Sequence, residues 1–354
     1  MTKTLNITAI AVLVIAIFYV LIVGEALLLP LVVAVALWYL INLLASGFRE
    51  AKFGTYQIPR PICLIASILT FVALGWAVVN FIGSSISDVR DVIPTYQANI
   101  ETRIRNLPFS EYLIDQETGD LTGFLLEPGW LDLPAIFTSL ASTFTSVVTS
   151  GGVIFIYIIF LLLEQGSFDK KISSLVNNPE REKRVRNIIK KIQYDIRKYI
   201  SIKMFTSTLT GVLSYAFLRI LDVDFAAVWG LLIFLLNFIP TVGSIIATIF
   251  PAVIALAQFE GYTQFVLVLA VIATFQVVIG NFLEPRMMGT SFNLSPLLIL
   301  LNLALWGYIW GLVGMFLCVP FLIIVFIVLA HFPQTRPIAV MLSADGNVSF
   351  IDEN

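Results

Sequence analysis

Residues 225–259 read FAAVWGLLIFLLNFIPTVGSIIATIFPAVIALAQF and hold no charged side chain. Proline lacks the backbone N–H that an α-helix needs and glycine favours a turn, so Pro240 and Gly243 divide this stretch into two helical arms. Each arm has about 13–15 residues and is about 20–22 Å long, which is less than the ~30 Å hydrocarbon layer of a bilayer. The pattern predicts a helical hairpin that enters a membrane from outside and turns within it.

A second uncharged stretch is also interrupted. Residues 293–329 read NLSPLLILLNLALWGYIWGLVGMFLCVPFLIIVFIVL. Its middle holds tryptophan and glycine residues, namely Trp306, Gly307, Gly311 and Gly314. Discontinuous helices that enter from opposite faces build the binding sites of many secondary transporters. We therefore expect a transport core over residues 202–330 with two interrupted or re-entrant hairpins, at 225–258 and 293–330.

The composition is that of an all-α polytopic membrane protein. Of 354 residues, 58% are hydrophobic and 12% are charged, whereas soluble proteins hold about 25% charged residues. The single histidine and two cysteines cannot form a zinc site, and no nucleophile–base pair is visible, so we expect no enzyme, no metal and no cofactor. The net charge of −2 gives no basic face for a nucleic-acid partner.

Other uncharged stretches predict about six full spans beside the two hairpins. These spans are expected at 4–24, 26–48, 61–87, 133–163, 204–218 and 262–282. Cytoplasmic N- and C-termini place most lysines and arginines on the inner side, as the positive-inside rule requires. The expected divisions are spans one to three in 1–83, an external helical and looped segment in 84–132, span four in 133–164, a cytoplasmic loop in 165–201, the transport core, and a cytoplasmic tail in 331–354.

Two polar segments lie outside the expected spans. Residues 181–200 have apolar side chains at three- and four-residue spacing and bases between them, which predicts an amphipathic helix on the cytoplasmic surface that binds anionic lipid. A nucleotide-binding role is the alternative, but no glycine-rich phosphate loop accompanies the bases. The external segment is expected to begin as a helix continuing from span three, and to act either as a connector or as a vestibule or oligomer contact.

Polar residues in the apolar core are candidates for a solute pathway. Most are hydroxyls and amides, including five hydroxyls from Thr206 to Ser214 on span five, which favours a neutral hydroxylated solute over a metal ion. Lys203 and Arg219 bound this span and are expected to reach the two interfaces. The candidate pathway residues are Asn237, Pro240, Gly243, Asn281, Ser295, Pro296, Asn302, Trp306, Gly311 and Gly314. Glu284, Pro285 and Arg286 are candidates for gating or ion coupling; the alternative is an interfacial ion pair worth ~0–1 kcal/mol.

Four motifs together resemble one family. They are DVDFAAVWGLLIFLLNFIPTVGS (222–244), NFLEPRMMG (281–289), LSPLL (294–298) and WGYIWGLVGMFLCVP (306–320). In order and spacing they resemble the autoinducer-2 exporter family of bacterial inner-membrane transporters, closely over 220–340 and more loosely over 1–219. The matched positions are Asn237, Pro240, Gly243, Glu284, Pro285, Arg286, Gly289, Ser295, Pro296, Trp306, Gly311, Gly314 and Pro320.

The resemblance implies a multi-pass inner-membrane transporter that exports the quorum-sensing signal autoinducer-2, contacts membrane lipids and forms a homo-oligomer. Other members are assigned to sodium–proton exchange, so the resemblance indicates fold better than substrate. The alternative function is therefore a cation–proton antiporter that uses Glu284, with its pKa set by Arg286 and Glu164. A membrane scaffold without transport would leave the two opposed interruptions unexplained.

Overall fold

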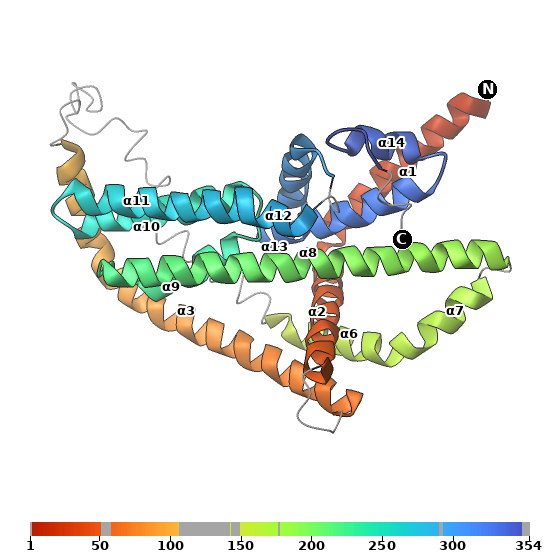
Figure 1. Cartoon of the computed structure of the whole chain (residues 1–354), viewed down its shortest axis with the longest axis horizontal. Helices are drawn as coiled ribbons and strands as arrows, with labels where there is room; N and C mark the ends of the chain where they lie inside the picture. Colours follow the sequence, from red (N-terminus) through yellow and green to blue (C-terminus); the bar gives the residue numbers. More distant parts are fainter. Residues whose placement is uncertain are drawn as a thin grey trace. The chain divides into compact units, whose positions relative to one another are not determined.

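The structure is a computed structural model of the chain, and it describes residues 2–50, 58–105, 142, 149–175, 178–289 and 293–348. Within these residues the regular elements are helices, apart from one isolated β-bridge between Leu294 and Ser343 (Figure 1). The prediction of an all-α protein is therefore confirmed.

The helices follow one another along the chain as two sets separated by undescribed residues. The first set is α1 (Thr2–Val23), α2 (Glu25–Glu50) and α3 (Arg60–Arg105). The second set is α6 (Gly151–Glu164), the 3₁₀ turn η2 (Gln165–Ser167), α7 (Phe168–Leu175), α8 (Pro179–Ile220), α9 (Ala226–Leu236), α10 (Val242–Gln258), α11 (Tyr262–Val277), the π-helix η3 (Val278–Leu283), α12 (Glu284–Met288), α13 (Pro296–His331) and α14 (Arg336–Leu342). Most of the predicted external segment, beyond Arg105, and the first part of span four lie outside the described residues.

Among the described residues, four helical segments could cross a membrane by length and composition: Glu25–Glu50, Arg60–Phe81, Tyr262–Met288 and Pro296–His331. Shorter apolar helices accompany them at Val12–Val23, Gly151–Ser167, Ala226–Leu236 and Val242–Gln258. Large apolar side chains such as Ile15 and Leu69 are exposed, as lipid-facing side chains are. The number of full spans and the sidedness of the termini stay predictions.

The chain divides into two compact units, which we describe separately. The first unit comprises Met1–Gly75, Ser146–Tyr199 and Thr290–Asn354, and the second comprises Trp76–Thr145 and Ile200–Gly289. In the first unit a small apolar core forms between α2 and α6. Its buried members are Ala34, Ile41, Ile154 and Ile158, with Leu64, Ile68 and Phe71 of α3 packed against them.

Helix α8 differs from the sequence prediction. We expected a boundary between residues 201 and 202, where a basic surface helix would give way to a spanning segment. The structure has one continuous helix of 42 residues instead, drawn in green in Figure 1. The basic residues and the apolar residues that follow them therefore belong to one helix, with no turn between them.

The first interrupted stretch forms a helical hairpin in the second unit. Helix α9 ends at Leu236, α10 begins at Val242, and Thr241 between them has a φ of 59°. The chain turns so tightly that a Cβ atom on Gly243 would lie 1.8 Å from the Leu236 carbonyl oxygen. Only glycine fits at that position, which is the physical reason why a glycine follows Pro240 in this hairpin.

The second interrupted stretch folds back on itself within α13, in the first unit. Trp310 and Gly311 leave the helical region, and Gly311 has a φ of 57°. The Asn302 Nδ2 donates a hydrogen bond of 2.6 Å to the Cys318 carbonyl oxygen, 16 residues along the chain. In an unbroken helix those residues would be about 24 Å apart. Both predicted interruptions are thus helical hairpins in the structure, and their depth in a bilayer stays a prediction.

Candidate functional site

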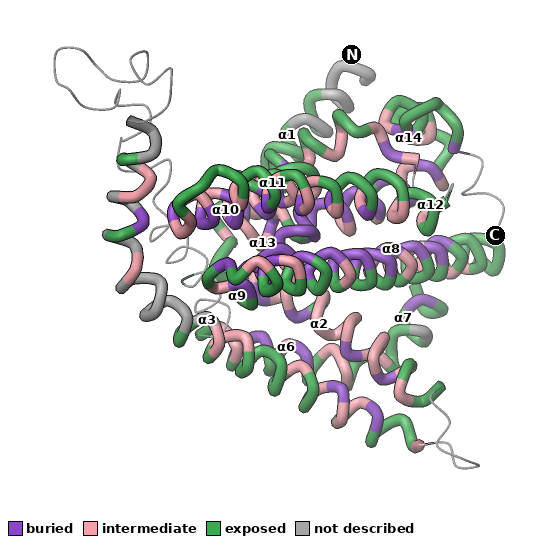
Figure 2. The backbone as a smooth tube through the Cα atoms, turned by 60° about the vertical axis from the view of Figure 1, so that its left-hand side comes forward, coloured by how far each residue is buried: buried purple, intermediate pink, exposed green. Residues whose placement is uncertain are grey.

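One face of α8 in the second unit is lined by polar groups. Between Lys203 and Ser214 every buried residue of the helix is either polar or glycine. These residues are Lys203, Thr206, Ser207, Thr210, Gly211 and Ser214. Their three- and four-residue spacing places them on one side of the helix, and buried positions recur along α8 in Figure 2. We call this set the α8 polar face.

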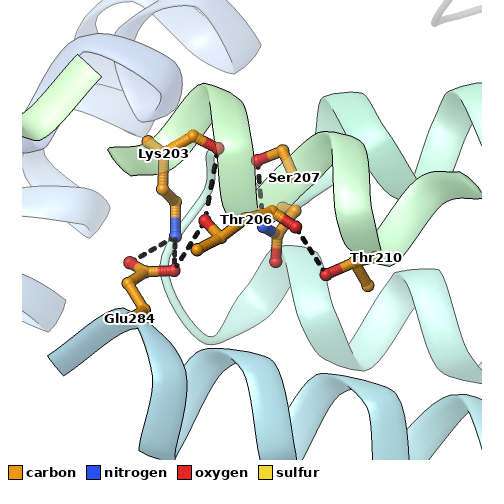
Figure 3. A network of polar contacts seen from close by, with 6 residues as sticks. Lys203, Thr206, Ser207, Thr210 and Glu284 are labelled. Carbon is orange, nitrogen blue, oxygen red and sulfur yellow. Dashed lines mark hydrogen bonds and ion pairs between the residues drawn. The ribbon is translucent and has the colours of Figure 1, made fainter. Parts of the chain in front are cut away.

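A buried ion pair lies at the beginning of this face. The Lys203 Nζ is 2.8 Å from the Glu284 Oε1 and 3.0 Å from its Oε2. The two side chains are only 10% and 13% exposed. The Thr206 Oγ1 lies 3.3 Å from the Glu284 Oε2 (Figure 3). Each charge compensates the other where little water reaches either, so the pair presents no net charge to its surroundings.

Hydroxyl and amide groups continue the face toward the first hairpin. The Asn237 Nδ2, at the end of α9, donates a hydrogen bond of 2.9 Å to the Ser207 Oγ. The Thr210 Oγ1 donates a hydrogen bond of 2.8 Å to the Thr206 carbonyl oxygen, as Figure 3 shows. Gly211 lets α9 approach closely, because a Cβ there would lie 2.8 Å from the Gly230 carbonyl oxygen. The interruption of the hairpin and the α8 polar face are therefore joined directly.

The π-helix η3 immediately precedes Glu284. A π-helix adds a residue to the turn and frequently occurs at functional sites. Asn281 within it is exposed, and so are Pro285 and Arg286 after it. Of the three residues predicted for gating or ion coupling, the structure thus brings Glu284 into the buried network, with Lys203 rather than Arg286 as its partner. Glu164, the other expected influence on Glu284, pairs with Lys171 in the first unit.

Lys203 belongs to the candidate site although the sequence did not predict it. We expected its side chain to reach the membrane interface, but the residue is buried. The available signal was its position at the start of a hydroxyl-rich helix face, four residues before Ser207 and seven before Thr210. Glu284 itself was a sequence candidate, but its pairing with Lys203, 81 residues away along the chain, leaves no signal in the sequence.

The first unit holds the remaining predicted pathway residues. Ser295 and Pro296 begin α13, where the Ser295 N–H donates to the Leu342 carbonyl oxygen at 3.2 Å. In the first arm of the hairpin, the Trp306 Nε1 donates a hydrogen bond of 3.1 Å to the Asn302 Oδ1. Both residues precede the fold-back at Gly311.

Aromatic packing closes this second hairpin. The Trp306 ring lies 4.4 Å from the Phe321 ring of the opposite arm and 5.0 Å from the Trp310 ring, measured between centroids. A Cβ atom on Gly314 would lie 2.0 Å from the Trp306 carbonyl oxygen. Asn302, Trp306 and Gly314 are thus brought together as the framework of one tight turn.

The chain is similar to known transport proteins. The family model described as AI-2E family transporter matches residues 9–334. The AI-2 transport protein TqsA of Escherichia coli is 31% identical over 291 residues, which cover 81% of this chain and 82% of the relative. A putative transport protein of Borreliella burgdorferi is 27% identical over 336 residues, with 93% and 89% covered. One from Haemophilus influenzae is 34% identical over 256 residues, with 67% and 73% covered.

These relatives are named as transport proteins and not as enzymes, in keeping with the absence of predicted catalytic groups. The matched range includes both interrupted hairpins, the α8 polar face and Glu284. This chain is therefore a multi-pass inner-membrane protein that belongs to the AI-2E transporter family.

Proposed function

We propose that this protein is a secondary transporter that exports a small, neutral, hydroxylated solute, with autoinducer-2 as the first candidate. The observation that carries the proposal is the α8 polar face. Hydroxyl and amide groups are costly to bury in an apolar protein unless they hydrogen-bond. Apart from Lys203, which Glu284 neutralises, the face consists of hydroxyl groups and glycine and suits a solute that exchanges its water hydrogen bonds for protein ones.

The charge of the face favours a neutral solute. Lys203 and Glu284 neutralise each other at 2.8 Å, so neither offers an uncompensated charge to an ion. The other polar members of the face are hydroxyls, to which Asn237 adds an amide. The family membership and the name of the E. coli relative make autoinducer-2 the natural first test solute.

The solute pathway in this proposal also includes the hairpin residues of each unit. Interrupted helices expose backbone groups that need a protein or water partner within a membrane. In the second unit the pathway residues are Asn237, Pro240, Gly243 and Asn281, with Glu284, Pro285 and Arg286 at the end of the same unit. In the first unit they are Ser295, Pro296, Asn302, Trp306, Gly311 and Gly314.

Transport in everted membrane vesicles tests the function. Vesicles from cells that produce the protein should take up autoinducer-2 faster than vesicles from cells with the empty vector, because export runs inward in everted vesicles. Intact cells that produce the protein should also hold less of the signal inside and release more outside. An equal ratio of internal to external signal, with and without the protein, contradicts the proposal.

Cation–proton antiport is the second candidate, and the buried Glu284 carboxylate is the observation that favours it. A transported cation would have to displace the Lys203 ammonium from both carboxylate oxygens. In everted vesicles this function predicts a sodium-driven change in internal pH that Glu284→Gln abolishes. Exchange that survives Glu284→Gln, or is absent from the wild type, removes this candidate.

Lipid contact and oligomerisation accompany the proposal. Exposed bases on the N-terminal half of α8 suit anionic headgroups, namely Arg181, Lys183, Arg184, Lys190 and Arg197. Transport in liposomes should therefore increase with the fraction of anionic lipid. A homo-oligomer, which the family resemblance implied, is tested by the mass of the purified protein in detergent.

A further inference from the structure

Two buried polar side chains in the second unit have no hydrogen-bond partner among the described residues. They are the Ser214 hydroxyl, on α8, and the Gln276 amide nitrogen, on α11. Both residues are more than nine-tenths buried. A buried polar group without a partner destabilises the protein, so native structures contain few of them.

Other helical hydroxyls in the same unit are satisfied in a simple way. The Thr208 Oγ1 donates a hydrogen bond of 2.7 Å to the Met204 carbonyl oxygen, and the Thr274 Oγ1 donates one of 2.7 Å to the Ala270 carbonyl oxygen. In each case the acceptor is one helical turn earlier in the chain. The Ser214 hydroxyl makes no such bond although it lies within α8, before the last turn of the helix.

The two unpartnered groups lie on helices that touch beside them. Ser214 is the last member of the α8 polar face, and Gln276 is on the buried side of α11. The rings of Phe217 and Phe275 meet edge to face with their centroids 6.4 Å apart. Phe217 is one turn after Ser214, and Phe275 immediately precedes Gln276. The unpartnered groups therefore belong to one region of the second unit.

We infer that Ser214 and Gln276 hydrogen-bond the transported solute, a neutral molecule with hydroxyl or carbonyl oxygens; this inference rests on the proposed function. The Gln276 amide nitrogen carries two N–H donors, which suit oxygen acceptors and repel cations. The Ser214 hydroxyl both donates and accepts, as a solute hydroxyl does. Ser214 is about 16 Å along the helix from Lys203, so this recognition pair is separate from the ion pair.

Flux of autoinducer-2 into liposomes that contain the full-length protein tests the recognition pair. Ser214→Ala and Gln276→Leu each remove the unpartnered group with little change of volume. Each should raise the KM about three- to tenfold, the effect of one lost hydrogen bond, with a maximal rate within about twofold of the wild type. Thr274→Val, at an exposed position on α11, is the matched control and should leave the KM unchanged.

Thermal unfolding without solute gives an independent readout. Because Ser214→Ala and Gln276→Leu delete unsatisfied groups, they should keep or raise the Tm, whereas groups that only support packing would lower it. Unchanged KM values for both variants overturn the inference and leave the proposed function intact. If the wild type moves no autoinducer-2 above empty liposomes, the proposed function fails. The inference then fails with it, whereas a lower Tm in both variants at an unchanged KM overturns the inference alone.

Discussion

Replacing Lys203 by methionine should destabilise the protein strongly. Methionine has about the length of the lysine stem and no charge, so Lys203→Met removes the ammonium and leaves the Glu284 carboxylate buried beside Thr206. Removing one partner of a buried ion pair costs about 3–5 kcal/mol. Because the two side chains keep 10% and 13% exposure, we take the lower end, about 3 kcal/mol.

The assay is thermal unfolding of the purified protein in detergent. A loss of about 3 kcal/mol lowers the Tm of a large domain by about 6–12 °C. The double variant Lys203→Met with Glu284→Gln should recover most of this loss, because no unpaired charge then remains. Lys171→Met is the matched control, since Lys171 also pairs with a glutamate, Glu164, but their side chains are 55% and 57% exposed.

For the control we expect a loss of about 0–1 kcal/mol, because water screens an exposed pair. Two results would refute the reasoning. One is an equal fall in Tm for Lys203→Met and Lys171→Met. The other is a double variant that is as unstable as Lys203→Met alone.

Two further predictions concern backbone geometry and pH. Gly243→Ala should abolish folded protein, because the alanine Cβ would lie 1.8 Å from the Leu236 carbonyl oxygen. Gly47→Ala is the control and should not change the yield, because no atom lies within 4 Å of a Cβ at that position. Size-exclusion chromatography of the purified variants compares the two yields of folded protein. Burial raises the pKa of Asp195, in the N-terminal half of α8, above its usual 3.8, and Lys191 only partly opposes this. The contribution of the Asp195 carboxyl to the free energy of unfolding is therefore greatest below pH 3.8, and it decreases as the pH rises toward the raised pKa. Asp195→Asn should remove that loss, so the Tm difference between variant and wild type should grow with pH over this window; a constant difference contradicts the assignment.

The two hairpins were predictable because their cause is local. Pro240 cannot donate a helical hydrogen bond, and a position with the φ of Gly311 is strained for any other residue. Such effects act within a few residues, so they are visible in the amino-acid sequence. Hydropathy likewise indicated a membrane protein, and the order of motifs indicated its family.

The continuity of α8 was not predictable from hydropathy. The composition changes from basic to apolar near residue 201, and we placed a boundary there. Backbone hydrogen bonds within a helix do not depend on the polarity of the side chains, so one helix includes both the basic and the apolar residues. The change from basic to apolar side chains therefore does not mark an end of the helix.

The sequence by itself determined that this chain is helical, membrane-embedded, twice interrupted and a member of a transporter family. Only the tertiary structure paired Lys203 with Glu284 and joined Asn237 to Ser207. It also left the Ser214 hydroxyl and the Gln276 amide nitrogen without a hydrogen-bond partner in the part of the chain that the structure describes. The physical reason is range. Helix breaking and hydropathy are properties of neighbouring residues, whereas a charge or a hydroxyl at a given position reads the same in the sequence whether it faces water, lipid or a partner 81 residues away.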